Sequence, residues 1–380
     1  MKTIKLGDFI SEVTEKTTEN NQHMVLTSSQ EGIVSQDEYF NKQVASKDTT
    51  GYKIVRKGQF TYRAMSDTGR FYINQLTKYD IGIVSPAYPV FEVTENNILR
   101  PAFLQLFFQS DYFQSLIANQ STGSTRVSLK LDKIRKIALP VPSYEEQGSI
   151  VDDLAKLRDT ITARRKQIEY LDELVKSRFI ELFGSQCHNE KNFAYGKIDD
   201  IAEIYLGLTH TPDYIGSGVK FISAKNTSGD FLDLSDVKYI SQEEFAQAPV
   251  GAKPRRGDVL FSRVGSNLGH PVILNTDEEL CTFVSLGYLR TKGAVTNMYL
   301  KHWMRDDFFA EQVRRKVVGG GQPNLNTGWL KEFKIIIPPM ELQEQFTAFV
   351  EQADKSKFEI QKSLGKLETL KKALMQKYFG

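Results

Sequence analysis

The residues whose chemistry best suits ligand recognition gather in one polar loop in each half of the chain. The loop of the first half contains Arg63, Ser66 and Arg70. The matching places in the second half hold Arg263, Ser266 and Asn267. Arginine pairs with guanine edges, asparagine pairs with adenine edges, and hydroxyl groups bond to phosphate oxygens. Both loops therefore predict contacts with nucleic acid, and for any single residue the alternative is a solvated hairpin loop.

A second pair of polar segments comes just before the long helices described below. The first segment contains Ser124, Thr125 and Arg126, and the second contains Gln322 and Asn324. Small residues allow the backbone to approach a phosphate group closely. Both segments therefore predict DNA contacts, with a plain domain-to-helix linker as the alternative. Lys225 and Asn226 are a further candidate pair in the second half.

Residues for catalysis or metal binding form no recognisable pattern. The chain has no glycine-rich phosphate loop with a lysine and no Asn-Pro-Pro-Tyr or Asp-Pro-Pro-Tyr run, which argues against an NTPase and against an amino-methyltransferase. Cys187 and His188 are adjacent rather than at ligand spacing, and Cys281 stands alone. The sequence thus predicts no catalytic residue, no metal site and no cofactor bound by this chain.

The elements that must position these loops are two long helices. From Ile150, steps of four and three residues reach Leu154, Leu157, Ile161, Arg164, Ile168, Leu171, Val175, Arg178 and Leu182. An apolar period close to 3.5 residues is typical of a coiled-coil seam. Ser143 and Glu146 have the spacing of a capping box at a helix start, and Gly184 stands where a helix commonly ends.

The same pattern recurs between residues 346 and 378. From Phe346 the steps reach Val350, Ala353, Lys357, Ile360, Leu364, Leu367, Lys371, Leu374 and Tyr378. Glu344-Gln345 repeats Glu146-Gln147 at an offset of 198 (344 − 146), and Phe379-Gly380 repeats Phe183-Gly184 at an offset of 196 (379 − 183). The chain therefore consists of two tandem units, each a mixed domain followed by one long helix.

Each long helix has an apolar seam that needs a partner. We expect the two helices to pair with each other, either antiparallel or parallel, and two separate surface helices are the alternative. Each domain mixes short strands with an aromatic helix, at 100–119 and at 299–313. The prediction is an α+β fold with mixed domains at 1–138 and 187–334 and long helices at 139–186 and 335–380.

The bulk composition adds bounds on location and partners. Hydrophobic residues make up 40% and charged residues 25%, as in an ordinary soluble globular protein. No run of eighteen apolar residues predicts a membrane span, no secretory signal is recognisable, and two cysteines are too few for a disulfide framework, so we expect a cytoplasmic protein. The net charge is only +2, so any DNA surface must come from local clustering.

Together these features resemble a known family. The Leu-Pro-Val-Pro and Ile-Pro-Pro lead-ins, the Glu-Gln pairs, the heptad helices ending in Phe-Gly and the preceding Gly-Asp-Val-Leu-Phe-Ser-Arg segment are similar to those of specificity subunits of type I restriction–modification enzymes. The resemblance covers essentially the whole chain. The first unit departs from it where Gly58-Gln59-Phe60 replaces the Gly-Asp-Val run.

The resemblance implies a non-catalytic subunit with two target recognition domains and an antiparallel coiled coil. Each domain would read one half of a bipartite, asymmetric site in double-stranded DNA, while the coiled coil sets the unread spacer and docks two modification subunits. S-adenosylmethionine would then be bound by the modification subunits, and ATP and Mg by restriction (motor-nuclease) subunits. A coiled-coil protein-interaction scaffold without DNA specificity is the alternative.

Overall fold

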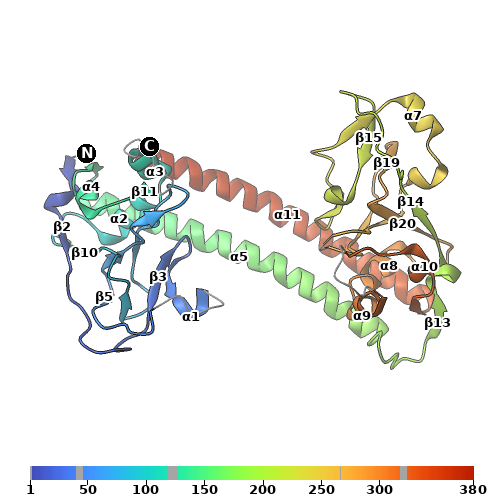
Figure 1. Cartoon of the computed structure of the whole chain (residues 1–380), viewed down its shortest axis with the longest axis horizontal. Coiled ribbons are helices and arrows are strands. Elements are labelled where there is room, and N and C mark those ends of the chain that lie inside the picture. The colour runs from blue at the N-terminus through green and yellow to red at the C-terminus, as the bar shows by residue number, and fades with distance from the viewer. Residues whose placement is uncertain (1, 40–45, 119–126, 266, 317–322) are drawn as a thin grey trace. The chain divides into compact units, whose positions relative to one another are not determined.

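The computed structural model describes residues 2–39, 46–118, 127–265, 267–316 and 323–380. The chain forms two compact units, one made of residues 1–166 and 361–380 and the other of residues 167–360. Each unit combines a mixed domain of helices and strands with part of both long helices, α5 (Tyr144–Phe183) and α11 (Met340–Phe379) (Figure 1). The predicted α+β class with two tandem mixed domains is confirmed.

The domain of the first unit is built from short strands and short helices. Its strands are β1 (Lys2–Lys5), β2 (Ile10–Glu12), β3 (Leu26–Ser29), β4 (Gly32–Ser35), β5 (Lys53–Arg56), β6 (Phe60–Thr61), β7 (Met65–Ser66), β8 (Asn74–Gln75), β9 (Ile81–Val84), β10 (Val90–Val93), β11 (Val127–Ser128) and β12 (Ala138–Val141). Its helices are α1 (Gln36–Tyr39), α2 (Pro101–Phe108), α3 (Asp111–Ala118) and α4 (Leu131–Arg135), with a 3₁₀ turn at Leu6–Asp8.

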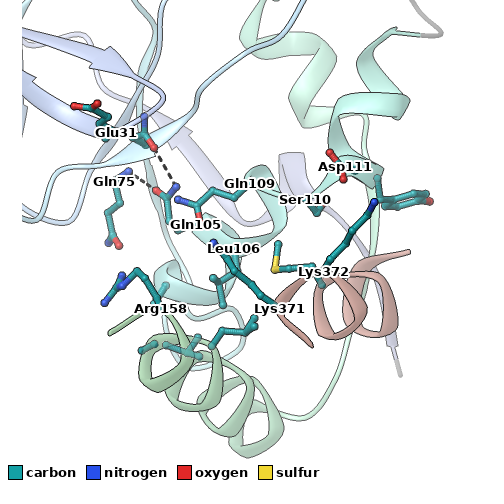
Figure 2. A pocket seen from close by; sticks show the side chains of 18 of the residues that line it. Glu31, Gln75, Gln105, Leu106, Gln109, Ser110, Asp111, Arg158, Lys371 and Lys372 are labelled. Atoms are coloured by element: carbon teal, nitrogen blue, oxygen red, sulfur yellow. Dashed lines mark hydrogen bonds between the residues drawn. The ribbon is translucent and has the colours of Figure 1, made fainter. Parts of the chain in front are cut away.

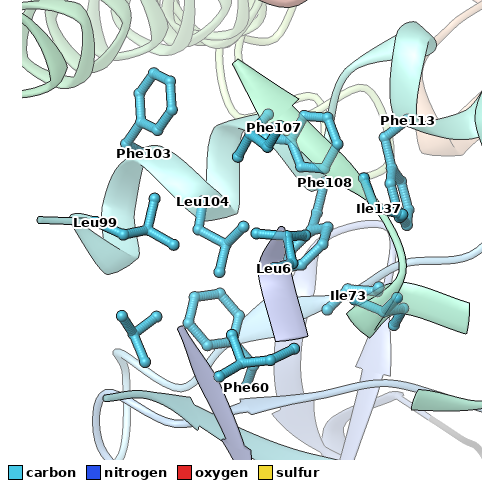
Figure 3. Packing of buried hydrophobic residues seen from close by; sticks show 14 of the residues in the cluster. Leu6, Phe60, Ile73, Leu99, Phe103, Leu104, Phe107, Phe108, Phe113 and Ile137 are labelled. Atoms are coloured by element: carbon cyan, nitrogen blue, oxygen red, sulfur yellow. The ribbon is translucent and has the colours of Figure 1, made fainter. Parts of the chain in front are cut away.

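A four-stranded antiparallel sheet in the order β2–β10–β6–β8 supports the core of this domain. Phe60 of β6 lies opposite Phe91 of β10, and their rings stack with centroids 5.2 Å apart. Phe108 of α2 meets both rings edge-on. Figure 3 shows Leu104 and Phe108 on the side of α2 that faces Phe60. The sheet and α2 therefore share one aromatic core, which fixes the helix against the strands.

The domain of the second unit repeats this plan. Its strands are β13 (Ala194–Lys197), β14 (Ala202–Leu206), β15 (Val219–Ile222), β16 (Lys238–Ile240), β17 (Val259–Ser262), β18 (Pro271–Ile273), β19 (Leu280–Thr282), β20 (Leu286–Thr291) and β21 (Lys334–Ile337). Its helices are α6 (Ile198–Ile201), α7 (Gln242–Gln247), α8 (Asn297–Trp303), α9 (Asp307–Lys316) and α10 (Thr327–Lys331), with 3₁₀ turns at Ala224–Thr227 and Val250–Ala252.

The sheet β14–β20–β17–β18 corresponds to the four-stranded sheet of the first domain. The strands of a three-stranded sheet, β16–β15–β19, are interleaved with those of the larger sheet along the chain. The smaller sheet contains the one parallel pair among the named strands of the described residues, β15 with β19. This smaller sheet has its own apolar cluster, which includes Phe221, Ile240 and Cys281. The second domain therefore has a second small core in addition to the one against its helices.

The start of each long helix is held by a two-stranded antiparallel sheet. In the first unit, β1 pairs with β12, with Lys2 opposite Val141. In the second unit, β13 pairs with β21, with Ala194 opposite Ile337. Each domain therefore binds the strand that leads directly into its own long helix.

The seams predicted for the two helices are nearly all confirmed. All ten seam residues of α5 are buried or half-buried, and the seam residues of α11 are too, except Lys371, which is exposed. In the first unit, Arg165 of α5 pairs with Glu368 of α11 at 2.7 Å. In the second unit, Lys357 of α11 pairs with Asp172 of α5. Early α5 thus lies beside late α11, and late α5 lies beside early α11, so the helices pack antiparallel.

The repeat register at the helix starts differs from the prediction. The buried Gln147 side chain donates to the carbonyls of Ile98 and Pro142, at 2.8 and 3.2 Å, and accepts from the Arg100 N–H at 2.9 Å. Gln343 makes the same three bonds, to Ala294, Pro338 and Thr296. Gln147 therefore corresponds to Gln343, an offset of 196 (343 − 147), and the pairing of Glu146-Gln147 with Glu344-Gln345 is wrong.

The predicted capping box at the start of α5 is confirmed. Glu146 accepts from the Ser143 N–H at 2.9 Å, and the Ser143 hydroxyl accepts from the Glu146 N–H at 3.3 Å. At the offset of 196, the second copy has Pro339 in place of Ser143. The two helices therefore begin at equivalent positions with different end chemistry.

Each of the expected aromatic helices is two helices in the structure. In the first domain, α2 ends at Phe108 and α3 begins at Asp111. The Ser110 hydroxyl donates to the Phe107 carbonyl at 2.7 Å and accepts from the Phe113 N–H at 3.1 Å. This side chain satisfies the open ends of both helices, so the chain turns there. In the second domain, α8 and α9 are divided at the equivalent place.

The departure from the Gly-Asp-Val run in the first unit is compensated by its neighbours. Asp258 accepts from the Arg255 N–H at 2.7 Å and from two N–H groups of Arg290 at 2.9 and 2.8 Å. Gln59 accepts from the Arg56 N–H at 2.8 Å and donates to Glu92 at 2.9 Å. The strand that leads to each candidate loop is therefore fixed in the same way in both units.

Within the described parts of the chain, no helix is both long enough and apolar enough to cross a membrane.

Candidate DNA interface

In the first unit, the predicted polar loop lies beside the strand that follows the second predicted segment, while residues 124–126 themselves lie outside the described residues. β7, in the loop that holds Arg63 and Ser66, pairs antiparallel with β11, the strand that follows residues 119–126. The Leu129 N–H donates to the Ala64 carbonyl at 2.9 Å, and the buried Tyr62 hydroxyl donates to the Leu129 carbonyl at 3.1 Å. Segments more than sixty residues apart in sequence therefore share one edge of the domain.

The predicted side chains of this loop differ in how they are bonded. Arg63 is exposed and, among the described residues, makes no hydrogen bond or ion pair. Arg70 is exposed and pairs with Asp111 at 3.2 Å, and the half-buried Ser66 hydroxyl lies 3.3 Å from that of Thr68. An exposed arginine without an internal acceptor is the side chain most available to a phosphate or a guanine edge.

The second unit makes the equivalent juxtaposition. Val264 forms an isolated antiparallel bridge with Asn324, and the Leu325 N–H donates to the Arg263 carbonyl at 2.8 Å. The loop with Asn267 therefore lies beside the segment with Asn324, and both of these asparagines are exposed. In both copies the loop therefore bonds to an equivalent main-chain position, Leu129 in the first domain and Leu325 in the second.

Arg263 has a structural role that the sequence did not reveal. Its guanidinium is half-buried and donates to the carbonyls of Val284 and Leu325, at 3.0 and 3.3 Å, and burial lowers its pKa. Its place in the repeat also differs from the prediction, because its carbonyl bonds Leu325 as that of Ala64 bonds Leu129. Arg263 thus corresponds to Ala64 rather than to Arg63.

The pair Lys225 and Asn226 is largely used within the chain. Asn226 is buried, its amide oxygen accepts from the Ser223 N–H at 2.9 Å, and its amide nitrogen donates to the carbonyls of Asp233 and Asp236, at 2.9 and 3.1 Å. Lys225 forms an ion pair with Asp236 at 2.9 Å, with both side chains well exposed. Asn226 therefore shapes its turn, while Lys225 remains accessible to a phosphate.

Five predicted contacts, Ser124, Thr125, Arg126, Ser266 and Gln322, lie outside the described residues. Contact with DNA stays a prediction for all thirteen sequence-predicted residues. Among the described residues, no group of three or more His, Cys, Asp or Glu side chains is placed to hold a metal ion.

Sequence reasoning missed a pair of pockets where each domain meets the long helices of its own unit. The first junction pocket, of about 1080 Å³, is lined by α2, the β3–β4 hairpin, α5 and α11. Figure 2 shows Gln105 directed toward the strands, with Arg158, Lys371 and Lys372 extending from the long helices. Gln105 donates to the carbonyl of Ile73 and to the Asn74 side chain, both at 3.2 Å.

The second junction pocket, of about 330 Å³, occupies the equivalent place in the second unit. At the offset of 196, Gln105, Leu106 and Gln109 correspond to Lys301, His302 and Arg305, which line it. The offset measured between the helix ends would have identified this correspondence from sequence. The sequence contains no signal for the closure of the pocket, because its walls come from separate elements.

The chain is similar to known proteins along nearly its whole length. The family model described as "Type I restriction modification DNA specificity domain" matches residues 1–171 and again residues 190–372. Curated relatives include the type I restriction enzyme MjaVIII specificity subunit of Methanocaldococcus jannaschii, 21% identical over 290 residues, which are 72% of this chain and 68% of that protein. The EcoKI specificity subunit of Escherichia coli is 20% identical over 314 residues, 74% of this chain and 67% of that protein.

Solved structures show the same fold. A chain of a type I R-M system studied for its complex assembly and conformational transition aligns with a TM-score of 0.62 at 18% identity, covering 100% of this chain and 97% of that one. The type I restriction-modification S subunit from M. genitalium aligns with a TM-score of 0.60 at 13% identity, covering 100% and 96%. With two family matches that account for both tandem units, this chain belongs to the type I restriction–modification DNA specificity family.

Proposed function

We propose that this chain is the non-catalytic subunit that selects the DNA site for a type I modification and restriction complex. The observation that carries the proposal is an edge repeated in both domains, where the polar loop bonds to an equivalent stretch through Leu129–Ala64 in one domain and Leu325–Arg263 in the other. Two copies of one edge with different side chains suit the reading of two different half-sites. The interaction-scaffold alternative is not favoured, because the family is one of DNA specificity domains.

In this proposal the residues at the edge have separate roles. Arg63, Asn267 and Asn324 are exposed and contact the bases or phosphates of the two half-sites. Arg263 and Asn226 hold the loops in shape through their bonds to main-chain groups. Substitution of a contacting residue should change which DNA sequence is bound. Substitution of a residue that holds the loop in shape should weaken binding to every sequence.

The two long helices supply the spacing and the docking surface. Each contains 40 residues, so each is about 60 Å long at 1.5 Å per residue. We assign them the role of setting the unread spacer and of binding two modification subunits, which carry S-adenosylmethionine, while restriction subunits use ATP and Mg. The net charge of +2 implies that partner subunits supply much of the phosphate contact.

Adenine-methylation mapping tests the division of labour between the two domains. Cells with this chain and its modification subunits should show a split motif that is absent without the chain. Arg63→Gln should relax or remove one half of the motif, and Asn267→Ala should affect the other half. Arg135→Gln, in an exposed pair with Asp132, is the control and should leave the motif unchanged. An unsplit motif, or the same half affected by both variants, would contradict the proposal.

Heptad insertion tests the helix pair as a ruler. Seven residues added to both helices at facing positions keep the seam in register and lengthen each helix by about 10 Å, or about three base pairs of DNA. The methylated motif should then keep both halves and gain about three unread base pairs. An unchanged spacer would show that another part of the complex sets the distance.

A further inference from the structure

The second junction pocket contains a buried cation that lacks a partner. Lys301 of α8 is 6% exposed and lines this pocket. Within the described part of the chain it makes no hydrogen bond and no ion pair. The ring centre of Phe231 lies 5.7 Å from its Nζ atom. Because a buried ammonium group without an acceptor is unfavourable, this side chain is suited to an anion from outside the chain.

The other buried or half-buried cations of the pocket already have acceptors. Arg305 donates to Asp230 at 2.8 Å. Lys357 pairs with Asp172 across the helix seam and lies 3.7 Å from Asp354 on its own helix. The carboxylates nearest to Lys301 are therefore engaged with other cations.

Three more titratable groups face the same space. Asp306 accepts from the Phe308 N–H at 2.8 Å, and burial raises its pKa. Lys176 of α5 is exposed at the rim. The Nε2 atom of His302 is buried without a partner, and burial lowers the pKa of this imidazole to about 3. Burial also lowers the pKa of Lys301 to about 8.

The first unit shows that the fold does not need a cation at this place. Gln105, the counterpart of Lys301, is fully bonded, since its amide nitrogen donates to Ile73 and Asn74 and its amide oxygen accepts from the Gln75 N–H. A neutral amide satisfied by its own domain therefore supports the same junction. The second unit therefore has a positive charge, on Lys301, that the first unit lacks, and no acceptor from the described residues of its own domain pairs with it.

We propose that the second junction pocket binds a small organic monocarboxylate, with its carboxylate on the Lys301 ammonium group. Val175, Phe179 and Val350 form apolar walls for the body of the ligand. The four aspartates at the pocket limit the ligand to a single negative charge, which excludes phosphate esters. The volume of about 330 Å³ is at the small end of ligand pockets. This site is independent of DNA recognition.

Benzoate, a monocarboxylate with an apolar ring, is the first probe. Titration calorimetry on the full chain should detect benzoate binding, whereas benzamide, of the same shape without charge, and inorganic phosphate should neither bind nor compete. Lys301→Gln introduces the residue of the first unit and should lower the benzoate affinity at least about tenfold. Lys372→Gln, which changes the first junction pocket, is the matched control and should leave the benzoate affinity unchanged.

Chemical labelling of the wild-type chain gives a test that does not depend on the folding of a variant. Acetic anhydride near pH 8 should acylate Lys301, and benzoate should protect this residue but not Lys372, as read by peptide mass spectrometry. Undetectable benzoate binding, equal binding of benzamide, full affinity in Lys301→Gln or labelling of Lys301 unaffected by benzoate would each overturn the proposal.

The pH dependence of binding supplies a further readout. With the Lys301 pKa near 8, the benzoate affinity should fall about tenfold between about pH 7 and about pH 9, because the ammonium group loses its proton. Lys301→Gln should abolish this difference, which separates the lysine from the other charged groups of the pocket. A wild-type affinity that stays constant over this range would contradict the assigned contact.

Discussion

The two junction pockets occupy the same place in the repeat and differ in the polar residues that the domain helix contributes to each. In the first, Gln105 and Gln109 are neutral, and in the second, Lys301 and Arg305 are charged. By contrast, the buried glutamines at the helix starts, Gln147 and Gln343, make the same three bonds in both units. The comparison shows that main-chain bonding at the helix start defines the repeat, while the pocket beside it varies in chemistry.

The largest expected effect concerns the aromatic residue at the end of each long helix. Phe183 is fully buried against Phe179, Tyr299 and Phe346. Phe379 contacts Phe103 and Phe107. Phe183→Ala should lower the free energy of unfolding of the second unit by about 3–5 kcal/mol, and Phe379→Ala should lower that of the first unit by slightly less.

Urea unfolding followed by hydrogen exchange of peptides from each unit measures both changes. Phe358→Ala, at an exposed position of α11, is the control and should have little effect. Equal destabilisation of both units by either variant would show that the units do not unfold separately.

The next effect depends on pH and distinguishes His302 from its counterpart Leu106. The folded imidazole has a pKa of about 3 because of burial, whereas the unfolded one titrates near 6.5. The unfolded chain therefore binds an extra proton below about pH 6.5, and stability falls as the pH falls, by about 1.4 kcal/mol per pH unit. His302→Leu should remove this component.

Urea midpoints of wild type and His302→Leu between about pH 7 and about pH 5 test this prediction. The stability difference between the two proteins should shift by about 2 kcal/mol in favour of His302→Leu at the lower pH. A constant difference between wild type and His302→Leu would mean that the imidazole is already charged in the fold.

Removal of either helix-start glutamine should have similar effects in the two units. Gln147→Ala and Gln343→Ala each leave buried main-chain groups without partners, so each should cost about 2 kcal/mol of unfolding free energy in its own unit. Gln345→Ala, at an exposed position, should cost little. Thermal denaturation of the three variants therefore tests the offset of 196, and a large effect of Gln345→Ala would favour 198 instead.

The smallest effect is expected at a seam position where a charged residue in one helix corresponds to an apolar residue in the other. Lys357, buried and paired with Asp172, has Ile161 as its counterpart. Because the Asp172 side chain is 52% exposed and stays hydrated without its partner, Lys357→Ile should change the free energy of unfolding by about 1 kcal/mol or less. Lys357→Ala should be more destabilising, because it also leaves a gap. Urea titration of both variants decides between these outcomes.

The comparison between the units also explains how Gln59 can replace the aspartate of the Gly-Asp-Val run without loss of the turn's connection to the neighbouring strand. Asp258 joins its turn to Arg290 of the neighbouring strand, and Gln59 joins its turn to Glu92. The strand partner changes together with the turn residue, so the connection is kept. A sequence read one segment at a time shows only the substitution in the turn.

The sequence by itself determined the local and periodic features of this protein. The 3.5-residue period predicted the buried seams of α5 and α11, and the spacing of Ser143 and Glu146 predicted the helix start, since each depends on neighbours within a few residues. The motifs of the two units also indicated the family and the tandem organisation.

Only the tertiary structure decided which polar side chains remain available. Arg263 and Arg63 look alike in sequence, yet Arg263 bonds to carbonyls from two distant segments while Arg63 is exposed. Lys301 is buried because α5, α8, α11 and the Asp230 loop enclose it together. The fate of a polar side chain depends on acceptors supplied by segments far apart in the chain, and the order of residues alone does not specify which segments will meet.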